Sequence, residues 1–124
     1  MSKILIVDDS ATMRKILMRV IRQAGVDCDG FVEASNGAEG LERLGAEAGV
    51  ALVLSDINMP VMNGVDFVKA IRSQPSREKL TILMVTTEGS ETMVKTAMDA
   101  GASGYVTKPF TPESIKSALV GLGR

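Results

Sequence analysis

The sequence contains no histidine, no tryptophan and only one cysteine, Cys28, in 124 residues. Without histidine the chain cannot use an imidazole base, a histidine-ligated metal site or a Ser-His-Asp triad. A single cysteine cannot form a disulfide within the chain, which fits a reducing compartment, and a lone thiol is most often a buried side chain. Any chemistry must therefore depend on other groups.

An excess of one charge and a long apolar segment are also absent. The chain has 14 basic and 15 acidic residues, so nothing in its charge favours nucleic acid or a membrane surface as a partner. No apolar run approaches the roughly 20 residues that span a bilayer, and the start "MSKILIVDD" has only four apolar residues before two aspartates, which does not fit a signal peptide. We therefore expect a cytoplasmic protein that folds as one domain over residues 1–124.

Short apolar segments alternate with helical patterns along the whole chain. Strands are expected at residues 3–7, 30–34, 50–55, 81–85 and 104–107. The first helix is predicted by the spacing of Met13, Ile16, Leu17, Val20, Ile21 and Ala24, and it should end at Gly25. Four similar patterns follow the later strands. Five successive βα units predict an α/β fold, a doubly wound five-stranded parallel sheet with helices on both faces.

Polar residues stand where four of these strands end. Asp8 and Asp9 follow the first strand, Asp56 the third, Thr86 the fourth, and Lys108 the fifth. In an open α/β sheet the ligand crevice lies outside the carboxyl ends of the strands, so these groups should converge. Three adjacent carboxylates repel one another unless a hard cation such as Mg²⁺ relieves the repulsion. Beside Mg²⁺, a lysine and a hydroxyl, Asp56 is arranged to attack phosphorus and become an aspartyl phosphate.

The same residues resemble the receiver domains of bacterial two-component response regulators. The matching segments are "DD" at residues 8–9, "SDINMPVMNG" at 55–64, "VTT" at 85–87 and "GASGYVTKPF" at 101–110. The likeness runs from the first strand to the last helix and is closest to the stand-alone chemotaxis members. It implies strand order 2-1-3-4-5, a cis bond before Pro109 and a single receiver domain with no output domain.

The resemblance also implies a role for each residue of the crevice. Asp56 would accept the phosphoryl group from a phosphohistidine on a histidine kinase. Mg²⁺ would be held by Asp9, Asp56 and the backbone carbonyl of Asn58, with Asp8 acting mainly through water. Lys108 would bind a phosphoryl oxygen. The protein would then be a switch that catalyses only its own phosphorylation and dephosphorylation, not an enzyme acting on other substrates.

In the family the signal leaves through two further residues. Thr86 would move its hydroxyl towards the phosphoryl group, and Tyr105 would follow from an exposed to a buried rotamer. The downstream partner would be a flagellar motor switch or another target, with a phosphatase as a possible further partner, and the protein is expected to be a monomer. Because Asn58 and Glu88 leave a path open for attacking water, we expect a short-lived phosphoryl group.

A partner surface is predicted on the face formed by the fourth helix, over residues 90–100, the fifth strand and the fifth helix. Val94 and Met98 lie beside the core-facing stripe of the fourth helix and should be at least partly exposed. Adjacent exposed apolar side chains next to a mobile tyrosine suit a helical partner, which flanking lysines would make acidic. The predicted surface consists of Val94, Met98, Tyr105, Lys95 and Lys116. The alternative is that Val94 and Met98 are scattered surface residues or widen the core.

Taken singly, the candidate residues have ordinary interpretations. Asp8 and Asp9 precede "SATMRK" and could cap the first helix, while Thr86, Lys108 and Tyr105 could be a surface hydroxyl, a solvated charge and a half-buried core residue. The solvated face of the first helix is expected to carry Arg14, Lys15, Arg19 and Arg22. Only the combination at successive strand ends favours a common site.

Three other functions use similar parts. A haloacid-dehalogenase-like phosphatase needs a second aspartate two residues after its nucleophile, where this chain has Asn58. A flavodoxin-like electron carrier needs a phosphate loop rich in serine and threonine, which is lacking, and aromatic side chains to stack on a flavin, of which the chain has only Tyr105 and three phenylalanines. A phosphorelay intermediate, which passes its phosphoryl group to a histidine of another protein, would have the same crevice and remains an alternative.

Overall fold

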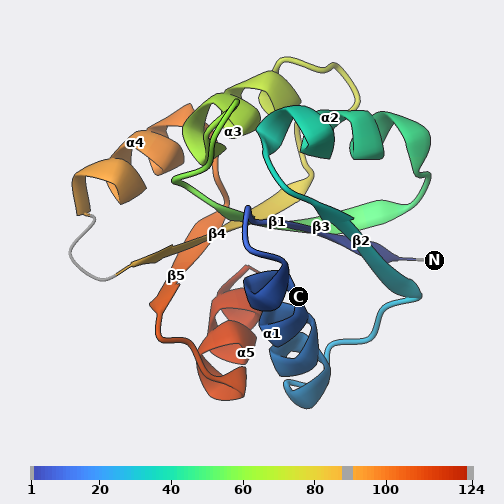
Figure 1. Ribbon diagram of the computed structural model, residues 1–124, viewed down its shortest axis with the longest axis vertical. Coiled ribbons are helices and arrows are strands. Elements are labelled where there is room, and N and C mark those ends of the chain that lie inside the picture. Colours follow the sequence, from blue (N-terminus) through green and yellow to red (C-terminus); the bar gives the residue numbers. More distant parts are fainter. Residues whose placement is uncertain (1, 88–90, 123–124) are drawn as a thin grey trace.

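The computed structural model describes residues 2–87 and 91–122, in which strands and helices alternate (Figure 1). The strands are β1 (Lys3–Val7), β2 (Gly30–Ala34), β3 (Val50–Asp56), β4 (Thr81–Thr87) and β5 (Gly104–Lys108). The helices are α1 (Ala11–Gln23), α2 (Gly37–Ala46), α3 (Gly64–Arg72), α4 (Glu91–Ala100) and α5 (Pro112–Gly121). All five predicted strands are confirmed, and the last three extend one or two residues further than expected.

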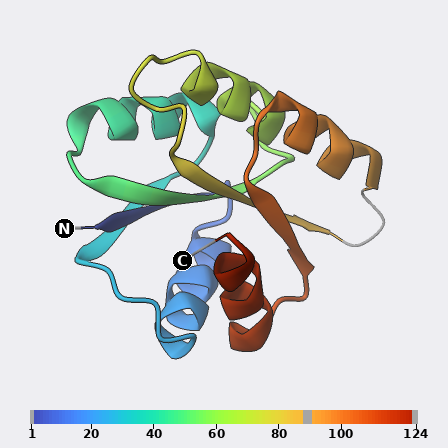
Figure 2. The ribbon, with the colours of Figure 1, turned by 180° about the vertical axis from the view of Figure 1, so that it is seen from behind.

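The strands form one parallel sheet in the order β2-β1-β3-β4-β5. Helices α1 and α5 cover one face of this sheet, and α2, α3 and α4 cover the other (Figures 1 and 2). The doubly wound fold predicted from the sequence is therefore confirmed, as is the strand order implied by the family resemblance. None of the helices in the described part of the chain has the length and apolar content to cross a bilayer.

Each face of the sheet has its own hydrophobic core. On β1, Leu5 belongs to the core beneath α2 and α3, whereas Ile6 belongs to the core beneath α1 and α5. Successive side chains of a strand point to opposite faces, so a strand that is covered on both sides is apolar throughout. This explains why the predicted strands do not alternate between apolar and polar residues.

Helix α1 follows its prediction with one exception. Ser10 caps the helix by accepting the N–H of Met13 at 3.2 Å, so neither Asp8 nor Asp9 has the capping role. Leu17 lies in the buried stripe, but Ile16 is 38% exposed. The expectation that Ile16 faces the core is therefore wrong, because its position is at the edge of a stripe narrower than the apolar pattern suggests.

Candidate functional site

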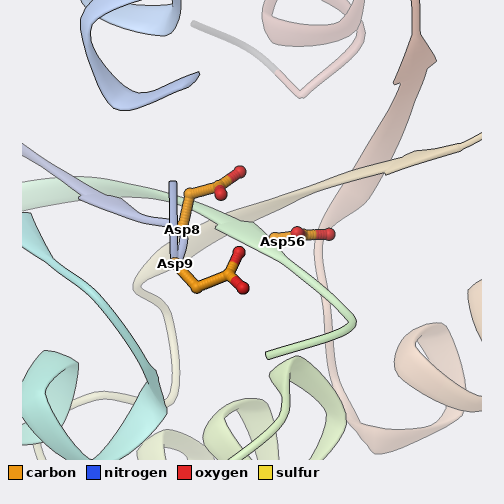
Figure 3. A group of neighbouring side chains, drawn as sticks. All are labelled: Asp8, Asp9 and Asp56. Carbon is orange, nitrogen blue, oxygen red and sulfur yellow. The ribbon is translucent and has the colours of Figure 1, made fainter. Parts of the chain in front are cut away.

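The acidic residues meet at the carboxyl edge of the sheet. Val7 at the end of β1 pairs with Ser55 on β3, so Asp8 and Asp56 leave neighbouring strands at the same level. Asp9 follows directly, and one carboxylate oxygen from each of the three residues lies within 4.8 Å of the others (Figure 3). Asp8 is buried, Asp56 is partly buried and Asp9 is exposed. The convergence predicted from the strand ends is therefore present.

Lys108 and Thr86 lie at the same edge of the sheet. The Nζ atom of Lys108 is 3.7 Å from Oδ2 of Asp8 and 3.7 Å from Oδ2 of Asp56. Thr86 is a buried residue of β4, and it follows Val85, which is the register partner of Asp56. The bond between Lys108 and Pro109 is cis, as the resemblance implied.

Burial dominates the electrostatics of this site. It raises the pKa of Asp8, opposed by the Ser10 N–H that donates to Oδ1 at 2.9 Å and reinforced by the charge of Asp56. Burial also raises the pKa of Asp56, opposed first by Lys108 and then by the backbone N–H groups of Ile57 and Asn58. Both carboxyls therefore hold their protons more tightly than free aspartates when no cation is present.

The arrangement fits a hard divalent cation. Oδ2 of Asp8 is buried and has no hydrogen-bond partner among the described residues, because the nearest ammonium is at ion-pair distance only. A buried acceptor without a partner is costly, and a cation bound nearby or a water molecule on that cation would satisfy it. The candidate metal ligands in the cluster are all carboxylate oxygens, which suits Mg²⁺.

In the metal-free protein, Asp8→Asn is expected to raise the free energy of unfolding at neutral pH by about 1 kcal/mol, because it removes a buried charge that is poorly compensated. The pKa of Asp8 is raised above its ordinary value of 3.8 in the folded state, so the folded protein keeps a proton that the unfolded chain has already lost. Wild-type stability therefore decreases as the pH rises from the ordinary pKa to the raised pKa of Asp8. The variant lacks this contribution and keeps only the similar contribution of Asp56.

Denaturant unfolding of both proteins in EDTA, from about pH 4 to neutrality, measures this difference. The advantage of Asp8→Asn should grow with pH, and saturating Mg²⁺ should reduce or reverse it by stabilising the wild type. An Asp8→Asn variant that is less stable than wild type at neutral pH without metal would contradict the view that Asp8 is a poorly compensated buried charge.

The loop between β3 and α3 contains a strained residue that sequence patterns did not reveal. Val61 has a φ of 66°, a left-handed conformation that β-branched residues rarely adopt, and its side chain is 86% exposed. The N–H of Met62 donates to the carbonyl of Pro60 at 2.7 Å across it. A tight turn in the loop that follows Asp56 thus imposes this conformation.

Val61→Asn should raise the free energy of unfolding by about 1 kcal/mol, because asparagine tolerates the left-handed region far better than valine. Chemical denaturation measures the gain. Val120→Asn is the matched control, because Val120 is also exposed but lies in helix α5, and it should change stability by no more than about 0.5 kcal/mol. Equal effects of the two substitutions would show that the turn is not strained.

The basic residues of α1 do not all behave as predicted. Lys15, Arg19 and Arg22 are exposed, as expected. The Arg14 side chain, in contrast, is only 16% exposed, and its Nε atom forms an ion pair with Oε1 of Glu33 at 3.0 Å. Arg14 lies at the edge of the buried stripe nearest β2, where a long side chain reaches back over the end of the sheet. Its assignment to the solvated face is therefore wrong.

The predicted partner surface is partly exposed. Tyr105 is 49% exposed and Met98 is 38% exposed, whereas Val94 is partly buried and packs against the core beneath α4. Lys95 and Lys116 are exposed. Val94 thus also widens the core, which was the alternative considered for it. The predicted helix start at residue 90, and Glu88 in the proposed water path, lie outside the described residues.

The strand order and the acidic strand ends are those expected of a receiver domain. The chain belongs to the response regulator receiver domain family, whose model matches residues 4–120.

Its relatives include chemotaxis proteins. It is 43% identical to chemotaxis protein CheY1 of Helicobacter pylori over 117 residues, which cover 94% of this chain and 93% of that protein. It is 42% identical to the chemotaxis protein CheY homolog of Campylobacter jejuni, covering 94% and 88% of the two chains. Among solved structures, the chemotaxis response regulator CheY4 of Vibrio cholerae matches with a TM-score of 0.83 and 37% identity over 98% of both chains.

Proposed function

We propose that this chain is a phosphorylation-activated signalling switch that accepts a phosphoryl group from a histidine kinase onto Asp56 and works in the chemotactic control of the flagellar motor. The observation that carries this proposal is the position of Lys108, whose ammonium lies equally close to Oδ2 of Asp56 and to Oδ2 of Asp8, the buried oxygen that has no hydrogen-bond partner among the described residues. The chemotaxis role is supported by the names of the relatives. A cytoplasmic location follows from the same proposal.

The two oxygens of Asp56 have different surroundings, which supports Oδ2 as the nucleophile. Oδ1 accepts the backbone N–H of Ile57 at 2.7 Å, whereas Oδ2 faces Lys108. Oδ2 therefore attacks phosphorus, the bond between phosphorus and the donor histidine nitrogen breaks, and the phosphoryl group passes to Oδ2. Lys108 then binds a phosphoryl oxygen and offsets its negative charge.

The residues that would hold Mg²⁺ are Asp9, Asp56 and the backbone carbonyl of Asn58, with Asp8 acting mainly through water. When bound, Mg²⁺ supplies positive charge that neutralises the phosphoryl oxygens during transfer. Asn58 is exposed and leaves a path for water to the phosphoryl group, so the proposed signal is short-lived.

The proposed switch couples Thr86 to Tyr105 across neighbouring strands. Met84 on β4 pairs with Tyr105 on β5, and Thr86 is two residues beyond Met84 on the same face of the sheet. A movement of the Thr86 hydroxyl towards the phosphoryl group opens space diagonal to Tyr105. The exposed Tyr105 ring then turns inward, and the face formed by α4, β5 and α5 changes shape.

Beryllofluoride, which mimics an acyl phosphate, tests this coupling without a partner protein. In wild type, its addition with Mg²⁺ should change the NMR signals of the Tyr105 ring and the Met98 methyl group as well as those of the crevice. In Thr86→Ala the crevice signals should change while those of Tyr105 and Met98 stay nearly fixed. Changes confined to the crevice in wild type would show that no signal reaches the α4–β5–α5 face.

Met98→Ser is expected to weaken binding of the downstream target to the activated form by about tenfold, since one well-packed apolar contact contributes on the order of 1 kcal/mol or more. Val94→Ser should weaken binding too, but its contact with the core should also lower stability. The rate of Asp56 phosphorylation should not change in either variant. Binding is measured against the beryllofluoride form, and equal target affinity of wild type and Met98→Ser would remove this surface from the interface.

A further inference from the structure

Arg14 connects helix α1 to the backbone beneath the acidic cluster. Its guanidinium donates from one terminal nitrogen to the backbone carbonyl of Asp8 at 2.6 Å, and from Nε to Oε1 of Glu33 on β2 at 3.0 Å. The Arg14 side chain is largely buried, although it carries a full charge. A partly exposed ion pair adds little stability, so the contact with Glu33 alone does not explain this placement.

The contact with Asp8 completes a set of hydrogen bonds that fixes this residue. The Asp8 N–H donates to the carbonyl of Ala34 at 3.1 Å, and the Asp8 carboxylate accepts the Ser10 N–H through Oδ1. Arg14 holds the remaining backbone group, the carbonyl. That carbonyl and the N–H of Asp9 belong to one rigid peptide plane, so fixing the carbonyl also fixes the direction in which the Asp9 residue begins.

We propose that Arg14 is a positioning residue for the divalent-cation site. It acts through the Asp8 carbonyl, which orients the peptide plane from which the Asp9 carboxylate is aimed into the crevice, and Glu33 holds the guanidinium in place. This inference rests on the proposed function, because it requires that a cation binds between Asp9 and Asp56.

Positioning and simple charge effects have opposite signs at this residue. The Arg14 guanidinium is positive and hydrogen-bonded to the backbone carbonyl of Asp8, so its charge alone disfavours a divalent cation nearby, and removing that charge should tighten Mg²⁺ binding. If Arg14 instead aims Asp9, removing it should weaken binding. Lysine separates the two effects further, because it keeps the charge but cannot reproduce the forked contacts with both the Asp8 carbonyl and Glu33.

The test is the dissociation constant of Mg²⁺, measured by NMR titration of backbone amides under conditions where every variant is fully folded. Arg14→Gln and Arg14→Lys should each bind Mg²⁺ about tenfold more weakly than wild type, as is typical when a residue that orients a metal ligand is lost. The control Arg19→Gln, which removes an exposed charge from the same helix, should bind like wild type. In the Arg14 variants without metal, amide shifts should concentrate at residues 8–10.

Mg²⁺ binding by Arg14→Gln that equals or exceeds wild-type affinity would overturn the positioning role, as would an equal loss in Arg19→Gln. If Arg14→Gln does not fold, the Mg²⁺ affinity of Arg14→Lys relative to wild type decides whether Arg14 has the positioning role. Wild type and Asp9→Ala are titrated in parallel. Wild-type protein that binds no Mg²⁺ would refute the proposed cation site itself, whereas wild-type binding that depends on Asp9 but not on Arg14 would refute only the inference about Arg14.

Discussion

Lys108→Met should slow phosphorylation of Asp56 by two to three orders of magnitude. Among the described residues, Lys108 is the one cation whose charged group lies within 4.0 Å of the Asp8 or Asp56 carboxylates. Removing a preorganised group that stabilises developing charge typically costs a factor of about 100 to 1,000 in rate. The rate is measured with acetyl phosphate and saturating Mg²⁺ by following the mass of the intact protein.

Two controls separate this effect from others. Lys116→Met removes an exposed lysine of α5 and should leave the rate within a factor of about two, because a distant surface charge is screened. Lys108→Met should bind Mg²⁺ at least as tightly as wild type, since a neighbouring positive charge is lost, so a slow reaction cannot be attributed to missing metal. A rate close to wild type in Lys108→Met would exclude Lys108 from the transfer step.

Wild type is expected to bind Mg²⁺ with a dissociation constant in the micromolar-to-millimolar range typical of weak carboxylate sites, and Asp9→Ala is expected to abolish this binding. Asp9 is the exposed member of the three carboxylates. Without it, two carboxylates of this cluster remain among the described residues, Asp8 and Asp56, both with raised pKa values because of their burial. Isothermal titration calorimetry measures the loss.

Asp99→Ala, an exposed acidic residue of α4, is the matched control for this substitution and should bind Mg²⁺ like wild type. Because phosphoryl transfer requires the metal in the proposed function, Asp9→Ala should also be phosphorylated far more slowly at every Mg²⁺ concentration. Unchanged Mg²⁺ affinity in Asp9→Ala would remove Asp9 from the site.

The sequence predicts the sheet and the crevice well for a physical reason. Strands buried on both faces must be apolar throughout, so Leu5 and Ile6 identify β1 although they face different cores. Polar residues that end such strands can only gather at the carboxyl edge, which is why Asp8, Asp56 and Lys108 could be placed together. The strand order itself came from the family resemblance, since alternation of strands and helices does not determine it.

The residues that prediction missed depend on neighbours remote in the sequence. Helical spacing placed Ile16 in the core and Arg14 in solvent. Both lie at edges of the buried stripe, where contacts with the rest of the fold determine whether a side chain is buried or exposed. For Arg14 the deciding partners are Glu33 and the Asp8 carbonyl. The left-handed conformation of Val61 is likewise imposed by its loop and not by its own preference.

The proposal that Asp56 is the phosphoacceptor is tested most directly by locating the phosphoryl group after incubation with acetyl phosphate and Mg²⁺. The account predicts that wild type gains the mass of one phosphoryl group, that borohydride reduction traps it on the peptide containing Asp56, and that Asp56→Asn gains none. A phosphoryl group found on another residue of wild type, or an equal mass gain in Asp56→Asn, would contradict the account.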